Sequence, residues 1–185
     1  MKQTFLKWGA WAFAVVVVFA GCKKEKGEHN EEEVITTVAL SFTPAGGGSV
    51  LEFEFNDPDG PGGLAPTADD IVLDANTTYD VTIAFRNDIA GEDITEEIEE
   101  EAEAHRIYYT AAAGSNISFS NLNNDGNGAP LGTSSTWTTT AAADGQVTIT
   151  LRHYGSNPPD KQGPDPVNSP KSSTDAEVVF QTSVQ

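Results

Sequence analysis

The chain has 185 residues, with 28 Asp and Glu against 10 Lys and Arg, so its formal net charge is −18 at pH 7. This charge argues against nucleic acid as a partner, because binding phosphate requires clustered Lys and Arg. The single cysteine excludes an intrachain disulfide and a cysteine-based zinc site. Beyond the N-terminal segment the chain is long enough for one domain with a hydrophobic core.

The first 21 residues have the pattern of an export signal. Lys2 and Lys7 introduce a positive charge, and the 14 residues from Trp8 to Gly21 carry none and are mostly apolar. That stretch is too short for a membrane-spanning helix, which needs about 20 residues, and it fits the apolar region of a signal peptide. It ends at Cys22, where a charged run begins.

The letters FAGC at this boundary resemble the lipobox of bacterial lipoproteins. The resemblance implies that residues 1–21 are a lipoprotein signal peptide and that Cys22 carries a lipid as the first mature residue. Acyl chains of this kind anchor a protein stably, because each buried methylene contributes about 0.8 kcal/mol. A membrane-spanning anchor, or an ordinary signal peptide with a chance cysteine, is the alternative.

Residues 22–33 contain the lipidated Cys22 and then KKEKGEHNEEE, which has no apolar residue. This composition indicates a flexible acidic tether. Its acidic residues resemble the signals that send lipoproteins of Bacteroidota to the outer cell surface, but a plain spacer has the same composition. We therefore expect a lipid anchor in the outer membrane and leave open whether the protein faces the periplasm or the cell surface.

Residues 34–185 read as a single domain in which apolar and polar residues mostly alternate, the pattern of half-buried strands. Turn-rich segments separate these runs. The pattern favours an all-β fold, an immunoglobulin-like β-sandwich of about seven to nine antiparallel strands with one short acidic helix. We expect strands at 34–42, 49–56, 70–73, 78–85, 106–111, 117–120, 146–153 and 176–184, with a long irregular loop at 156–173.

The helix is predicted at about 93–104, where Ile94, Ile98 and Ala102 recur every four residues. Asp93 is a suitable N-cap residue, because its side chain can accept hydrogen bonds from the first backbone N–H groups. Most of the other residues in this segment are acidic. Such a face is usually solvated, although it could also dock against a basic surface of a receptor or gather cations.

Several segments together resemble a group of small Bacteroidota lipoproteins: EEEVITTVALSFT, DPDG, EDITEEIEEEAEAH, NDGNGAPLGTSSTW and VTITLRH. Members are often labelled "type 1 periplasmic binding fold superfamily" and are frequently encoded beside TonB-dependent receptors. The resemblance implies a role in uptake. The resembling lipoproteins also have a histidine at each of the positions of His105 and His153. The fold in that label requires two α/β domains with many helices, which a chain with one predicted helix cannot supply.

No sequence motif of an enzyme is present, so we expect a protein without catalytic activity. His105 and His153 each fall at a strand end, and alternation places both on the inward side of a sheet near its rim. If the two ends meet, their imidazoles and an acidic residue such as Glu101 would form a site for Zn²⁺ or Cu²⁺. Two polar rim residues that hydrogen-bond to the backbone are the more common situation for such a pair.

Calcium is the other candidate cofactor. Asn121, Asn123 and Asp125, followed by Gly126, imitate the start of an EF-hand loop, but Gly132 replaces the bidentate Glu at the twelfth position. A hairpin turn explains the same residues.

From the sequence we therefore expect an outer-membrane lipoprotein that acts as a non-enzymatic binding module. Its role would be accessory to TonB-dependent uptake of a metal or a metal complex, with a TonB-dependent outer-membrane receptor as its partner. The alternative is a structural or adhesive surface lipoprotein whose loops contact a protein or a glycan.

Overall fold

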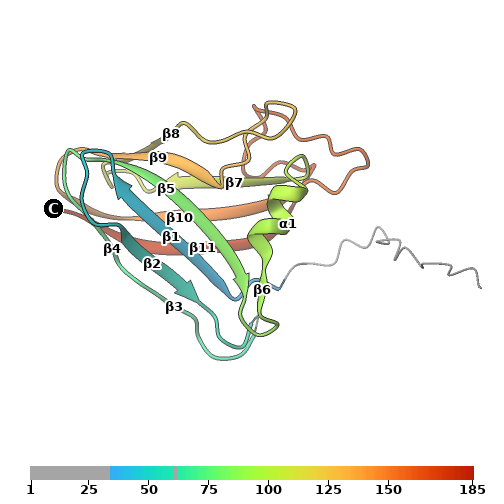
Figure 1. Cartoon of the computed structure of the whole chain (residues 1–185), viewed down its shortest axis with the longest axis horizontal. Coiled ribbons are helices and arrows are strands. Elements are labelled where there is room, and N and C mark those ends of the chain that lie inside the picture. The colour runs from blue at the N-terminus through green and yellow to red at the C-terminus, as the bar shows by residue number, and fades with distance from the viewer. Residues whose placement is uncertain (1–33, 61) are drawn as a thin grey trace, which may run out of the picture.

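A computed structural model describes residues 34–60 and 62–185, which form two β-sheets packed face to face (Figure 1). Within these residues the larger sheet has seven strands and the smaller has four. The larger sheet has the order β3 (Thr67–Ala68), β2 (Leu51–Asn56), β1 (Thr37–Pro44), β5 (Thr78–Asn87), β9 (Ser134–Thr139) and β8 (Ile117–Ser120), with β6 (Glu92–Asp93) beside β5. The smaller sheet has the order β4 (Ile71–Leu73), β11 (Ser173–Val184), β10 (Ala143–His153) and β7 (His105–Ala111).

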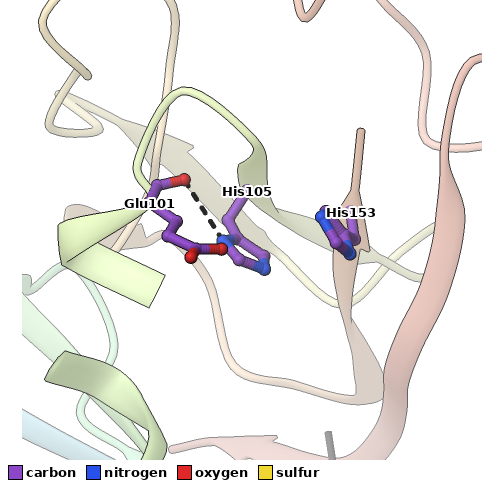
Figure 2. A group of neighbouring side chains, drawn as sticks. All are labelled: Glu101, His105 and His153. Carbon is purple, nitrogen blue, oxygen red and sulfur yellow. Dashed lines mark hydrogen bonds between the residues drawn. The ribbon is translucent and has the colours of Figure 1, made fainter. Parts of the chain in front are cut away.

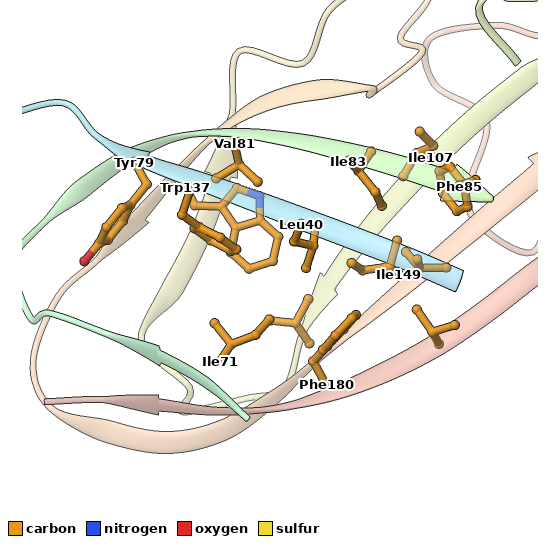
Figure 3. Packing of buried hydrophobic residues seen from close by; sticks show 14 of the residues in the cluster. Leu40, Ile71, Tyr79, Val81, Ile83, Phe85, Ile107, Trp137, Ile149 and Phe180 are labelled. Carbon is orange, nitrogen blue, oxygen red and sulfur yellow. The ribbon is translucent and has the colours of Figure 1, made fainter. Parts of the chain in front are cut away.

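The core lies between the sheets and follows the alternation in the sequence. On β5, Val81 and Ile83 are buried while Asp80 and Thr82 are exposed, because neighbouring side chains of a strand point to opposite faces. Figure 3 shows side chains from both sheets meeting in this layer. Trp137 on β9 is fully buried and makes edge-to-face contacts with several aromatic rings. These rings belong to Phe42, Tyr109 and Phe119.

The predicted all-β sandwich is confirmed, with two differences in detail. Among the described residues nine strands remain when the two-residue strands β3 and β6 are left aside, which is within the predicted range, but the sequence does not predict β9. The strands are also not all antiparallel, because β4 pairs with β11 in the parallel direction. The predicted segments 1–21 and 22–33 lie outside the described residues.

The helix α1 (Ile94–Glu100) is shorter than the predicted 93–104. Asp93 caps it as expected, since its carboxylate accepts a hydrogen bond from the backbone N–H of Thr95. The helix stops at its acidic end for an electrostatic reason. Glutamates four residues apart repel one another, and the negative end of the helix dipole has no basic residue to offset it. Residues 101–104 form a turn that leads directly into β7.

One end of the sandwich collects the elements around the two histidines. The start of β7, the end of β10, helix α1 and the loop 154–172 all lie there (Figure 1). The loop is irregular, as predicted, but it is held in place: the Nη1 of Arg106 donates to the backbone oxygens of Gln162, Gly163 and Asp165. This loop and the turn after α1 therefore form fixed walls around that end of the molecule.

Candidate metal site

His105 and His153 meet in space, a question that the sequence left open. His105 begins β7, His153 ends β10, and the antiparallel register places the two residues opposite one another. Their rings stack with centroids 4.7 Å apart and planes inclined by 25°. Two imidazoles from adjacent strands thus share the same inward-facing edge of the smaller sheet.

Glu101 joins the two histidines because α1 ends beside them. It is the C-cap residue of the helix, and the short turn after it brings the chain back to His105. One potential ligand atom from each of Glu101, His105 and His153 lies within 4.8 Å of the other two. Figure 2 shows the three side chains converging. We call this group the histidine site.

The hydrogen bonding of His105 defines its tautomer. Its Nδ1 lies 3.2 Å from the backbone oxygen of Glu101, and a carbonyl oxygen can only accept, so Nδ1 carries the proton. The lone pair of the neutral ring is then on Nε2. An imidazole whose other nitrogen donates to a backbone carbonyl is the usual arrangement for a metal-binding histidine.

Burial keeps the ring of His105 neutral. Only 1% of this residue is exposed, and burial is the main reason why its pKa falls from 6.5 to about 4. The charges of His153 and Lys161 lower the pKa further, while the hydrogen bond to Glu101 opposes the change. At neutral pH His105 therefore holds the unprotonated nitrogen that a metal ion requires.

The histidine site opens into a pocket of about 500 Å³. Glu101 is exposed and His153 half-buried, so both are accessible from the pocket, whereas His105 lies behind them. The remaining walls come from the turn after α1 and from the first residues of the loop 154–172. Acidic side chains predominate among the charged residues of the lining: Glu99, Glu100, Glu101 and Glu103. Such a lining attracts cations toward the two histidines.

Asp175 is a further acidic residue at this site, and its place there could not be predicted from the sequence. Its Oδ2 lies 3.9 Å from Nε2 of His105, and only 4% of its side chain is exposed. It comes from β11, the neighbour of β10 on the side away from β7. The alternation of apolar and polar residues along β11 predicts that Asp175 faces solvent, so this pattern did not indicate a role for Asp175 at the site.

The three residues of the predicted calcium loop have structural roles instead. Asn123 accepts hydrogen bonds through Oδ1 from the backbone N–H groups of Gly132 and Ser134. Asp125 accepts through Oδ1 from two backbone N–H groups, and its Oδ2 lies 2.9 Å from the ammonium of Lys161. Asn121 donates to the hydroxyl of Thr136. The geometry does not support calcium binding here, because the only carboxylate of the three is already used by a lysine and by the backbone.

Cys22, the predicted lipidation site, lies outside the described residues. No helix among the described residues is both long and apolar enough to cross a membrane.

No protein-family model matches the chain, and no curated protein or solved structure is significantly similar to it.

Proposed function

We propose that this protein is a non-enzymatic binding module that captures a Zn²⁺ or Cu²⁺ ion at the histidine site. The observation that carries the proposal is the convergence of Glu101, His105 and His153, whose potential ligand atoms lie within 4.8 Å of one another. Two imidazole nitrogens and a carboxylate oxygen are donors that both ions accept.

The position of the three donors supports capture from solution. Glu101 and His153 line the pocket, so an ion arriving from outside meets them before it reaches the buried ring of His105. Metal–ligand bonds to these donors are about 2.0–2.2 Å long, so the side chains must close slightly around an ion. Glu101 can make that movement because it is exposed and lies beyond the last residue of α1.

The sequence supports a cellular setting for this capture. A lipid on Cys22 would hold the domain at the outer membrane through the tether of residues 22–33, on its periplasmic or cell-surface face. The resemblance to lipoproteins encoded beside TonB-dependent receptors suggests that the module delivers its metal, or a metal complex, to such a receptor. We propose this accessory role in uptake as the physiological function.

Metal binding by purified protein tests the proposal. We expect the wild-type protein, stripped with a chelator and then incubated with Zn²⁺ or Cu²⁺, to retain one ion per chain after desalting. His105→Ala and His153→Ala should lose the ion, and Glu101→Gln should bind it more weakly. Glu96→Gln is the matched control, because it removes an equal charge from the exposed first turn of the same helix.

The outcome also separates the proposal from its rival. A wild-type protein that retains neither ion, and whose thermal unfolding neither ion alters, would refute metal capture. That result would favour the structural or adhesive lipoprotein, whose loops contact a protein or a glycan.

A further inference from the structure

The strand β11 contains an irregularity where it passes the histidine site. Its pairing with β10 runs in step from Val184 to Ala176, which lies opposite Leu151. The next paired residues are Arg152 and Thr174, so the register passes over Asp175. This is a β-bulge, in which one strand contains one residue more than its neighbour.

The bulge accounts for the direction of the Asp175 side chain. In a regular strand Asp175 would share the outer face with Glu177 and Val179, both of which are exposed. Its side chain is instead only 4% exposed and approaches His105. Bulges are a common means of turning a side chain toward a functional site.

The ring of His105 and the carboxylate of Asp175 thus lie close together inside the protein. Nε2 of His105 carries the lone pair of the neutral ring, because Nδ1 donates its proton to the backbone oxygen of Glu101. The carboxylate oxygen of Asp175 lies 3.9 Å from that nitrogen. Bonds of about 2.0–2.2 Å at a tetrahedral zinc ion place a histidine nitrogen and a carboxylate oxygen roughly 3.4 Å apart, so this pair must close by roughly half an ångström to share one ion.

We propose that Asp175 is the fourth ligand of the histidine site, an inference that rests on the function proposed above. Two nitrogens and two carboxylate oxygens would then surround the ion, Glu101 and His153 from the pocket side and His105 and Asp175 from the interior. Asp175 is placed next to His105 and is not one of the three residues whose ligand atoms already lie within 4.8 Å of one another, so its carboxylate must move toward Glu101 and His153 when an ion binds. Four protein ligands complete the tetrahedral shell that Zn²⁺ prefers and leave no position for a reacting water. The site is therefore suited to holding an ion and not to activating a water molecule.

The test compares Asp175→Asn with Glu177→Gln. Both changes remove one carboxylate from β11, but Glu177 points outward and its Oε2 accepts a hydrogen bond from Thr150. We expect Asp175→Asn to weaken Zn²⁺ binding at least tenfold, measured by competition with a chelator of known affinity. It should also change the visible absorption of the Co²⁺-loaded protein, because the coordination sphere of the ion changes. Glu177→Gln should leave both measurements as in the wild type.

An Asp175→Asn protein with the zinc affinity and the cobalt spectrum of the wild type would overturn the fourth-ligand assignment while leaving metal capture intact. A wild-type protein that binds no metal would instead overturn the proposed function, and this inference with it. Should Asp175→Asn fail to fold, as judged by circular dichroism, a crystal structure of the zinc-loaded wild type decides. Oδ2 of Asp175 is expected within about 2.2 Å of the ion, and a carboxylate outside the coordination sphere contradicts the assignment.

Discussion

The ammonium of Lys161 lies 2.9 Å from Oδ2 of Asp125, and the two side chains are 1% and 2% exposed. The same ammonium donates to the backbone oxygens of Ala102 and His105, at 2.5 and 2.6 Å. One buried lysine therefore fastens the loop 154–172 to the turn after α1 and to the first residue of β7. These are the backbone segments that carry the pocket wall and the buried histidine.

Replacing Lys161 by Met should lower the free energy of unfolding by about 3–5 kcal/mol, because it leaves the carboxylate of Asp125 buried without its counter-charge. Urea denaturation at neutral pH measures the loss. Lys171→Met provides the comparison, since Lys171 forms a more exposed pair with Asp165 and its loss should cost no more than about 1 kcal/mol. Equal losses in the two variants would show that burial of the Lys161 pair has no special energetic weight.

The metal-free protein should lose stability as the pH falls from about 6.5 to about 4. In this range the unfolded chain protonates His105, whose ordinary pKa is 6.5, while the folded chain, with a pKa of about 4, does not. The proton therefore favours unfolding, and the stabilisation present above pH 6.5 is lost progressively on acidification, to a total of about 3 kcal/mol.

His105→Gln isolates this contribution from the other groups that titrate in acid. Urea unfolding of both proteins at several pH values, with chelator present, should show a flatter pH dependence for the variant between pH 6.5 and 4. Parallel curves for the two proteins would contradict the prediction.

Zinc should stabilise the folded protein if only the folded state assembles the histidine site. At a free concentration 100 times the dissociation constant, the expected gain is about 2.7 kcal/mol, measured as a rise in the thermal midpoint that excess chelator reverses. His153→Ala should remove the rise without unfolding the protein, because His153 is only half-buried. A zinc-dependent rise of equal size in this variant would mean that zinc binds elsewhere.

Trp137→Ala should lower the free energy of unfolding by about 3–5 kcal/mol, because it removes the largest fully buried side chain of the core and leaves a cavity in its place. Val179→Ala on the outer face of β11, where Val179 is 41% exposed, should change it by no more than about 0.5 kcal/mol. Urea denaturation compares the two. A small loss for Trp137→Ala would contradict the central role of the aromatic cluster around it.

Strands with a strong apolar alternation could be predicted from the sequence, and β9 could not. Its inward positions are Ser135, Trp137 and Thr139, so only one of the three is strongly apolar. Those residues are buried through contacts with distant segments, including the hydrogen bond from the Thr139 hydroxyl to the backbone oxygen of Asp74, just after β4. The parallel pairing of β4 with β11 was also unpredictable, because a three-residue strand contains no information about its neighbour.

For the candidate site, local alternation was enough to place His105 and His153 on inward faces near strand ends, because the direction of a side chain depends only on its own strand. Their meeting depended on the register between β7 and β10, which long-range packing decides. Asp175 and Lys161 depended on tertiary structure alone: a bulge turns the first one inward, and a folded loop carries the second to Asp125. The sequence by itself determined an all-β domain and which way each regular strand faces, since both follow from the local period of apolar residues. Only the tertiary structure decided which strands are neighbours and where the pattern is broken, and those two features assemble the histidine site.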